Sequence, residues 1–255
     1  MIRYYLPKGM RYSSLKEREQ FYTQEFRIDK VEEWLRTVEG RIAFAVIIGR
    51  HTHIYPAKYK KDASTTIIID EYANLEEVKN LVTEFLPESV YYDRNVYESE
   101  NKIVGQELAF DLDPENINCP IHGNLAEKMK KGQGLGFCKL ELQLVKEQAL
   151  SLYEYLEKSF SFLKIVYSGR GYHIHVFDKK AYKMTKKEKR QLAKTVKAKG
   201  FPIDEWVTAG DMRLIRLPYS LHGLVSRIAI PLDFHELRRF EPINDERCIP
   251  VFLKT

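Results

Sequence analysis

Residues 167–176 read Tyr-Ser-Gly-Arg-Gly-Tyr-His-Ile-His-Val, and this run governs what the sequence predicts about the fold. Apolar residues stand on both sides of the four-residue turn at 168–171, a pattern typical of a β-hairpin. Because successive side chains of a strand point to opposite faces, His173 and His175 would share one face. The tyrosine, isoleucine and valine of the same strand would lie on the other face, so this strand is predicted to border both a core and a polar site.

The turn carries groups that bind anions. Its two glycines allow the backbone to turn tightly and to approach a ligand closely. Ser168 and the backbone amides can donate to phosphate oxygens, and Arg170 can pair with a phosphate through two hydrogen bonds. Together with His173 they predict an anion or nucleotide site. The alternative is an ordinary glycine-rich hairpin with a solvated arginine and solvated histidines.

Helices and strands alternate along most of the chain, which predicts the α/β (α+β) class. Apolar or β-branched runs predict strands at 41–48, 65–69, 90–97, 107–113, 163–167, 172–177, 212–217 and 226–231. Helical spacing predicts one or two helices within 14–37 and further helices at 74–86, 140–160 and 185–200, the last with a capping box. The stretch 114–136 reads as irregular.

Composition bounds the remaining possibilities. The chain has 255 residues, of which 44% are hydrophobic, and no repeat or flexible linker divides it, so we expect one domain over 1–255. This composition excludes a disordered or collagen-like chain. The net charge of +5 permits an anionic partner. The N-terminus lacks a secretory signal, and no apolar run is long enough for a membrane helix. Cysteines are also few, which is typical of a reducing compartment. We therefore expect an intracellular, cytoplasmic protein without a membrane partner.

A second motif is Phe110-Asp111-Leu112-Asp113, at the end of a predicted core strand. Residues two apart on a strand face the same way, so the two carboxylates would point together. Like charges at short range repel unless a cation lies between them, and Mg²⁺ or Mn²⁺ prefers carboxylate oxygens. The pair therefore predicts a catalytic metal site, the alternative being two exposed aspartates at a strand end.

A third motif spans residues 211–223 and combines an acid, arginines, a hydroxyl and an imidazole. Asp211 is a candidate metal ligand, and Arg216, Ser220 and His222 are candidate ligands of a nucleotide phosphate. The alternative is a surface strand followed by a loop.

Cysteine and histidine spacing predicts a zinc site. Cys119 and His122 stand three residues apart, and Cys138 follows later in the chain. Structural zinc takes four ligands, so a fourth would come from a carboxylate such as Glu141 or from a distant histidine, His51 or His53. The alternative is two free buried cysteines. The third cysteine, Cys248, reads as a small buried hydrophobe.

The segment 179–199 contains ten lysines and arginines and only one acidic residue, Glu188. Such a charge imbalance favours a track for nucleic-acid phosphates. A solvated helix face is the alternative.

Taken in this order, the motifs resemble those of the archaeo-eukaryotic primase superfamily, and in particular the small catalytic subunit of archaeal DNA primase. The segments that carry the resemblance span nearly the whole chain: 18–22, 107–113, 167–174, 203–208, 213–223 and 239–250. The resemblance implies the primase fold, in which mixed sheets are flanked by helices, with a small zinc-binding insertion at 114–140.

The resemblance also implies an activity: a DNA-directed nucleotidyltransferase that makes primers on single-stranded DNA with two divalent metals. Asp111, Asp113 and Asp211 would hold Mg²⁺ or Mn²⁺. The incoming NTP or dNTP would lie against Ser168, Arg170, His173 and His222. Cys119, His122 and Cys138 would hold Zn²⁺. A primase large subunit or fused C-terminal domains are the further partners implied.

Three alternatives stay open at this point. A repair or translesion polymerase of the same superfamily would extend a primer without starting one. A non-catalytic nucleic-acid-binding subunit would have a degenerate site. A metal-dependent nuclease would use an acidic pair but would not need a triphosphate pocket.

Overall fold

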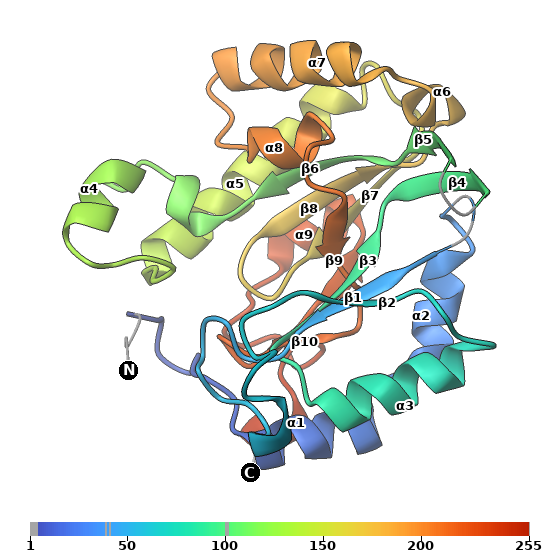
Figure 1. Cartoon of the computed structure of the whole chain (residues 1–255). Helices are drawn as coiled ribbons and strands as arrows, with labels where there is room; N and C mark the ends of the chain where they lie inside the picture. The colour runs from blue at the N-terminus through green and yellow to red at the C-terminus, as the bar shows by residue number, and fades with distance from the viewer. Residues whose placement is uncertain (1–4, 39, 41, 100–101, 255) are drawn as a thin grey trace.

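A computed structural model describes residues 5–38, 40, 42–99 and 102–254. Two four-stranded antiparallel sheets organise the fold (Figure 1). The first has the order β2-β1-β3-β9, with bounds Ile67–Ile69, Phe44–Ile47, Ser89–Asp93 and Leu214–Arg216. The second has the order β12-β7-β8-β6, with bounds Ile230–Leu232, Leu163–Tyr167, Tyr172–Val176 and Leu108–Leu112. The mixed α/β class is therefore confirmed.

The predicted hairpin forms the centre of the second sheet. Strands β7 and β8 pair antiparallel with Tyr167 opposite Tyr172, and β6 pairs with the other side of β8. Apolar side chains that alternate along β6 and β8, such as Phe110 and Ile174, pack into one core. The residues between them, among them Asp111 and His173, face the opposite side of the sheet.

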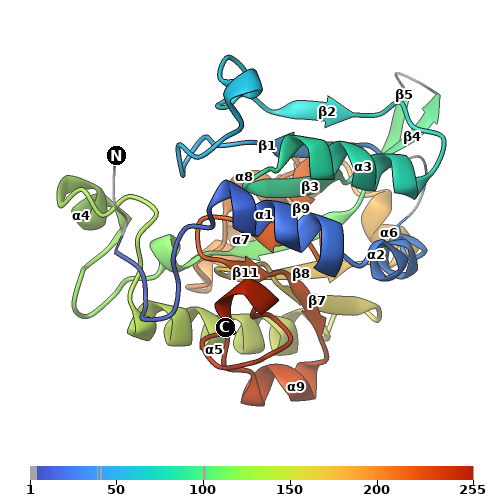
Figure 2. The same ribbon diagram turned by 90° about the horizontal axis from the view of Figure 1, so that it is seen from below.

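The two faces of the second sheet border different cores. One face packs against α5 (Lys139–Leu156), α7 (Lys186–Ala198) and α9 (Phe234–Arg239). The other borders a core that includes residues of the first sheet, together with α2 (Ile28–Leu35) and α3 (Leu75–Phe85). Figure 2 shows α5 and α9 on the side of the second sheet that lies away from the first. The polar face of β6 and β8 is thereby turned toward the first sheet.

Shorter elements complete the described part of the chain. The remaining helices are α1 (Leu15–Gln20), a π-helical turn (Phe21–Glu25), α4 (Leu125–Lys130), α6 (Lys179–Tyr182) and α8 (Glu205–Thr208). Single 3₁₀ turns occur at Ala57–Tyr59, Pro114–Asn116 and Val251–Leu253. The pairs β4–β5 (Asn95–Ser99, Lys102–Gln106) and β10–β11 (Leu221–His222, Arg227–Ile228) form two small ribbons. Within the described ranges, no helix is long and apolar enough to span a bilayer.

Several boundaries differ from the sequence predictions. The strand predicted at 90–97 is two strands, because the chain turns at the buried Arg94, whose guanidinium donates to the carbonyls of Glu107, Val207 and Met212. The strand predicted at 226–231 is divided between β11 and β12. Helix α4 forms inside the stretch read as irregular, and α6, α8 and α9 were not predicted. Arg41, the first residue of one predicted strand, lies outside the described residues.

Candidate functional site

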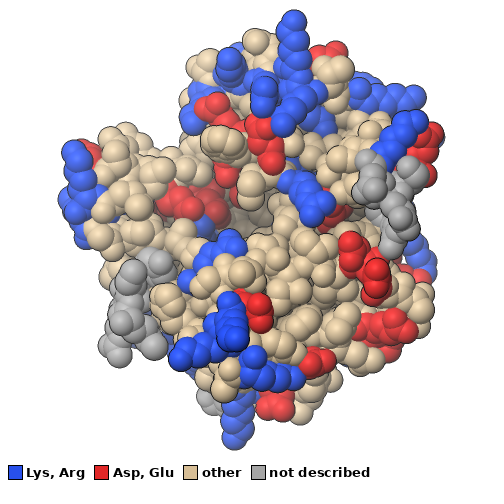
Figure 3. Space-filling view, in the orientation of Figure 1, with Lys and Arg blue, Asp and Glu red and all other residues tan. Residues whose placement is uncertain are grey.

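A cavity of about 160 Å³ lies where the two sheets face each other. The second sheet contributes the carboxylates of β6 and its end, the β7–β8 turn and β8, and the first sheet contributes β3 and β9. Among its lining residues are Asp111, Asp113, Ser168, Arg170, His173, Arg216 and His222. Figure 3 shows a hollow near the centre of this face, with acidic side chains on one side of it. The structure thus brings most of the residues singled out in three separate motifs into one pocket.

The two carboxylates of the Asp-x-Asp motif are held differently. Asp113 Oδ2 accepts a hydrogen bond of 2.6 Å from Arg170 Nη2, and the same guanidinium lies 2.5 Å from Glu115 Oε2. Asp111 Oδ1 is buried and accepts no hydrogen bond from the described residues, although His173 Nε2 lies 3.3 Å away. Asp113 is therefore ion-paired with a guanidinium, whereas Asp111 faces the His173 imidazole and its buried Oδ1 has no hydrogen bond of good geometry from the described residues.

The electrostatics of the pair fit a divalent cation. Burial raises the pKa of Asp113 to about 8, because the nearby charges of Asp111 and Glu115 add to the effect of burial and Arg170 only partly offsets them. Burial also acts against ionisation of Asp111, but His173, Arg170 and Arg216 lower its pKa below the usual value. Burial thus acts against ionisation of both carboxylates, and hard oxygen donors of this kind suit Mg²⁺ or Mn²⁺.

The glycines of the β7–β8 turn are required by close packing. Gly169 has a φ of +98°, and a Cβ there would lie 2.5 Å from His222 Cβ. A Cβ on Gly171 would lie 2.1 Å from the carbonyl oxygen of Leu112 and 2.6 Å from Asp113 Oδ1. Ser168 Oγ accepts from the backbone N–H of Gly171 at 3.0 Å, which fixes the turn. The turn can therefore lie directly against the aspartate end of β6 and against His222.

The opposite wall of the pocket is basic and aromatic. Arg216 donates to Ser89 Oγ at 3.1 Å, and its guanidinium lies 5.1 Å from the centre of the Tyr91 ring. Burial lowers the pKa of His222 well below its usual value, and the neighbouring Arg216 and Arg170 lower it further. His222 is therefore neutral at physiological pH. This wall offers positive charge from arginine and a neutral imidazole.

Two predicted site residues lie elsewhere. Ser220 is fully buried, donates to the carbonyl of Leu217 at 2.6 Å and does not line the cavity. Asp211 is 2.5 Å from Lys186 Nζ and 3.1 Å from Arg190 Nη2, in a hollow beside α7 and α8. The structure does not bring either residue into the pocket of Asp111, because the turns that carry them direct the side chains to other partners.

A carboxylate that the sequence analysis overlooked lies beside β6. The backbone N–H of Asp204 donates to the carbonyl of Asp111 at 2.9 Å, next to an isolated bridge between Leu112 and Ile203. Burial raises the pKa of Asp204, and the charges of Asp111 and Glu115 raise it further. The acid of the segment 203–208 thus shares the electrostatic environment of the aspartate pair. The sequence motif at 203–208 contributes to the resemblance described above, but local sequence alone does not indicate a role for Asp204.

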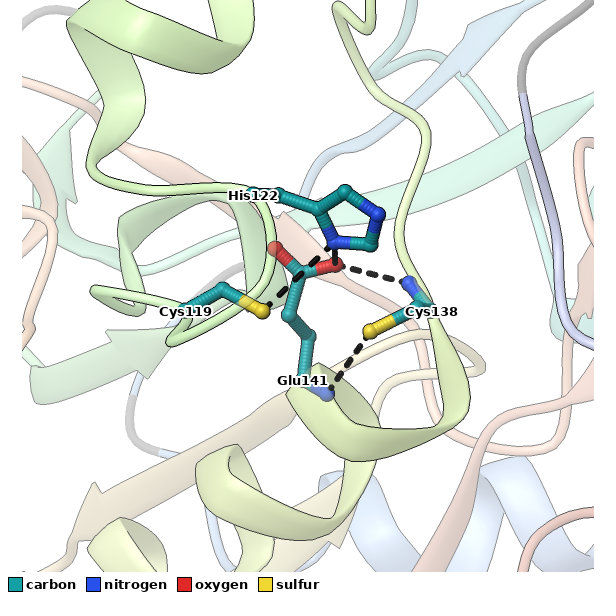
Figure 4. A group of neighbouring side chains, drawn as sticks. All are labelled: Cys119, His122, Cys138 and Glu141. Atoms are coloured by element: carbon teal, nitrogen blue, oxygen red, sulfur yellow. Dashed lines mark hydrogen bonds and ion pairs between the residues drawn. The ribbon is translucent and has the colours of Figure 1, made fainter.

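The cysteine–histidine motif assembles at the base of α4 and α5. Cys119, His122, Cys138 and Glu141 each offer a ligand atom, and these atoms all lie within 4.8 Å of one another (Figure 4). His122 Nδ1 is 3.5 Å from Cys119 Sγ and 3.7 Å from the Glu141 carboxylate. Of the fourth ligands considered, Glu141 is the residue that joins the cluster, whereas His51 lines the cavity described above.

Surrounding groups hold the cluster in place. Glu141 Oε2 accepts from the backbone N–H of Cys138 at 2.7 Å, and the buried Lys128 lies 2.5 Å from the other carboxylate oxygen. Burial, with Glu141 and Cys119 nearby, raises the pKa of the Cys138 thiol to about 11. Two sulfurs, one imidazole and one carboxylate are a donor set that fits four-coordinate zinc, whose charge would favour the thiolate form.

Known proteins similar to this chain are DNA primase small subunits and a polymerase domain. No family model matches the chain. It is 51% identical to an uncharacterised DNA primase small subunit-like protein of Archaeoglobus fulgidus, over 99% of this chain and 95% of that protein. It is 28% identical to the DNA primase small subunit PriS of Pyrobaculum calidifontis, over 70% of each chain. Among solved structures, the polymerase domain of Mycobacterium tuberculosis ligase D in complex with DNA matches 98% of this chain and 92% of that one, at 15% identity and a TM-score of 0.56. This last likeness shows the fold.

Proposed function

The chain belongs to the DNA primase small-subunit family, and we propose that it is a template-directed nucleotidyltransferase that starts primers on single-stranded DNA. The single observation that carries the proposal is the shared pocket. One carboxylate of β6, a second directly after its end, and the turn of the β7–β8 hairpin line the same cavity. A nuclease would use an acidic pair but would not need a pocket that binds a triphosphate.

The carboxylate side of the pocket is proposed to hold the catalytic metals. Asp111 and Asp113 would bind Mg²⁺ or Mn²⁺, with Asp204, rather than Asp211, as the third acid. Bound there, the metals would activate the attacking 3′-hydroxyl and stabilise the departing pyrophosphate. Support comes from the buried Asp111 Oδ1, which accepts no hydrogen bond of good geometry from the described residues, and from the position of both carboxylates in one cavity.

The remaining residues are proposed to bind and orient the triphosphate of an NTP or dNTP. Arg170 and Arg216 supply two guanidinium groups that pair with phosphate oxygens. The Ser168 hydroxyl offers a further donor, because its oxygen only accepts a hydrogen bond within the turn. His173 on β8 lines the same cavity, and its buried Nδ1 has no hydrogen-bond partner among the described residues, so the imidazole can contact a phosphate there. Neutralising triphosphate charge in a buried pocket is the main electrostatic task of phosphoryl transfer.

The cluster of Cys119, His122, Cys138 and Glu141 is proposed to bind structural Zn²⁺ in the insertion at 114–140. Cys138 is the N-cap residue of α5, a helix that packs on the second sheet. A metal bound there would fix the insertion to helix α5, and through it to the sheet that lines the pocket. A single-stranded DNA template, and a primase large subunit or fused C-terminal domains, are the partners proposed from family membership.

Primer synthesis on unprimed single-stranded DNA tests this function. The assay offers NTPs and dNTPs separately with Mg²⁺ or Mn²⁺, and compares wild type with Asp111→Ala and Asp113→Ala. Product from wild type alone supports a primase. Extension of a supplied primer without synthesis on unprimed template would indicate a repair polymerase. Neither product, with DNA binding intact, would indicate a non-catalytic subunit, and degradation of the template would indicate a nuclease.

A further inference from the structure

Trp206 is an exposed tryptophan with no role in the core. It lies on α8 and keeps 67% of its surface accessible, whereas Trp34, the second of the two tryptophans, keeps 4%. Exposed large aromatic side chains cost free energy in water, and a π-face held open on a short helix is suited to stacking. The exposed position of Trp206 is therefore better explained by binding than by a contribution to folding.

A hollow of about 260 Å³ lies between Trp206 and helix α7. Ala193 and Ala209, both buried, form its floor. Arg190 and Lys194 border it from α7, and Glu205 and Asp211 border it from the side of α8. We refer to this hollow as the α7–α8 groove. It combines an aromatic face, a small-residue floor and cationic edges.

The α7 side of the groove is strongly basic. Lys186, Arg190, Lys194 and Lys197 follow one another at spacings of four, four and three, which places them on one face of the helix. Lys186 and Arg190 share the carboxylate of Asp211, and Lys197 pairs with Glu205. Four cations thus face two acids. Figure 3 shows lysine and arginine gathered over the part of the surface that α7 occupies.

Helix α8 connects the α7–α8 groove with the candidate pocket. Val207, the residue after Trp206, lines that pocket, and Asp204 at the start of α8 hydrogen-bonds to Asp111 through its backbone. On the other side, Ala209 and Asp211 also border a second hollow beside β5, which Lys186 and Arg213 line. The groove therefore shares a border with the hollow beside β5, and the helix that carries Trp206 also carries a residue of the candidate pocket.

We propose that the α7–α8 groove binds single-stranded nucleic acid, with one base stacked on Trp206 and the flanking phosphates on Arg190 and Lys194. This inference deepens the proposed function, because it names the path of the template strand. Asp211 would act there as a positioning residue that holds Lys186 and Arg190 at the edge of the groove. Stacking on an aromatic ring next to basic residues is how proteins bind single strands without reading sequence.

Intrinsic fluorescence offers a direct test, because Trp206 is the exposed one of two tryptophans. Titration of the full chain with a 20-residue oligothymidylate is expected to quench the emission, and Trp206→Phe is expected to remove the quenching. Anisotropy of a labelled oligothymidylate gives the affinity. Trp206→Ala should weaken binding by about tenfold, the loss of one stacked base, and Trp206→Phe should retain most of the affinity.

Charge reversal tests the phosphate contacts. Lys194→Glu should weaken binding and lower the slope of log affinity against log salt by about 0.7 or more. Lys16→Glu, an equally exposed lysine on α1 at the opposite end of the molecule, serves as the matched control (Figure 1). Phe162→Ala, which removes another exposed aromatic ring, controls for the loss of surface apolar area.

These outcomes separate the groove from the catalytic proposal. The pair Asp111→Ala and Asp113→Ala should abolish synthesis but leave oligothymidylate binding and quenching intact. Absence of synthesis from wild type as well, with normal quenching, would leave the groove supported and the catalytic proposal refuted. Binding by Trp206→Ala and Lys194→Glu that equals wild type would overturn the groove. A change of oligomeric state in Trp206→Ala, with unchanged DNA binding, would identify a protein interface instead and would also overturn it.

Discussion

Asp111 on β6 and His173 on β8 are direct cross-strand partners, and His173 Nε2 lies 3.3 Å from Asp111 Oδ1. The pairing register of one sheet therefore places a candidate metal ligand against a candidate phosphate ligand. A slip of one residue in the pairing of β6 with β8 would turn the side chain of the shifted strand, Asp111 or His173, toward the apolar core. The chemistry of the pocket depends on the same register that the buried alternation of Phe110 and Ile174 enforces.

We expect His173→Ala to impair nucleotide use more than template binding. A hydrogen bond to a charged group is worth about 1.5–3 kcal/mol, so the apparent KM for the nucleotide should rise by about 10- to 100-fold. Steady-state primer synthesis at several nucleotide concentrations measures this, with oligonucleotide anisotropy as the control. An unchanged KM and rate would contradict a phosphate role for His173.

The third acid of the site can be identified by comparing two equivalent substitutions. Asp204 is coupled electrostatically to Asp111, whereas Asp211 is ion-paired with Lys186 and Arg190 outside the pocket. We expect Asp204→Asn to lower kcat by about 10- to 100-fold, as changes near a metal commonly do. At saturating template, Asp211→Asn should keep most of its kcat.

The reverse pattern would restore Asp211 as the third acid. Circular dichroism and thermal unfolding of both variants are the controls, because Asp204 also caps α8 by accepting from the N–H of Trp206. A loss of kcat in Asp204→Asn is informative only if the variant unfolds at a temperature close to that of wild type.

Local patterns explain which parts of the site could be predicted from the sequence. The hairpin of β7 and β8 follows from alternation around a glycine turn, and the paired orientation of Asp111 and Asp113 follows from strand geometry alone. The capping box of α7 at Thr185 and Glu188 also forms as expected. Each of these features is fixed by residues within a few positions of one another.

Long-range contacts explain what could not be predicted. Asp204 reaches Asp111 through the bridge between Leu112 and Ile203, which joins segments that are about ninety residues apart. The strand predicted at 90–97 is divided at Arg94, whose guanidinium donates to the carbonyls of Glu107, Val207 and Met212, all distant in the sequence. Nothing in the local sequence around either residue specifies these partners.

We expect one Zn²⁺ per chain in protein purified without chelators, measured by elemental analysis. Cys119→Ser and Cys138→Ser should lose the metal, because each removes a thiolate from the cluster. Cys248→Ala should keep it, since Cys248 is buried elsewhere in the second core. A strong chelator should lower the Tm of wild type and leave that of Cys119→Ser unchanged. Substoichiometric metal in wild type, with an unchanged Tm after chelation, would refute the zinc site.

The buried Lys189 predicts a rise of stability with pH. Burial and, to a smaller extent, the nearby charge of Arg94 lower its pKa to about 7, while its amine donates to the carbonyl of Gln106 at 2.7 Å. The unfolded chain holds this proton up to a pKa of about 10.4. Between about pH 7 and pH 10 the unfolded state therefore binds more protons, so the free energy of unfolding contributed by Lys189 increases with pH.

Lys189→Met should remove this dependence, because methionine has a similar length and no titratable group. Urea unfolding of wild type and variant at pH 6.5, 8 and 9.5 measures the difference. The stability of wild type relative to the variant is expected to be lowest at pH 6.5 and to grow toward pH 9.5. Parallel pH profiles would mean that Lys189 keeps its ordinary pKa in the folded chain, and that its bonds to Gln106 hold an ammonium group.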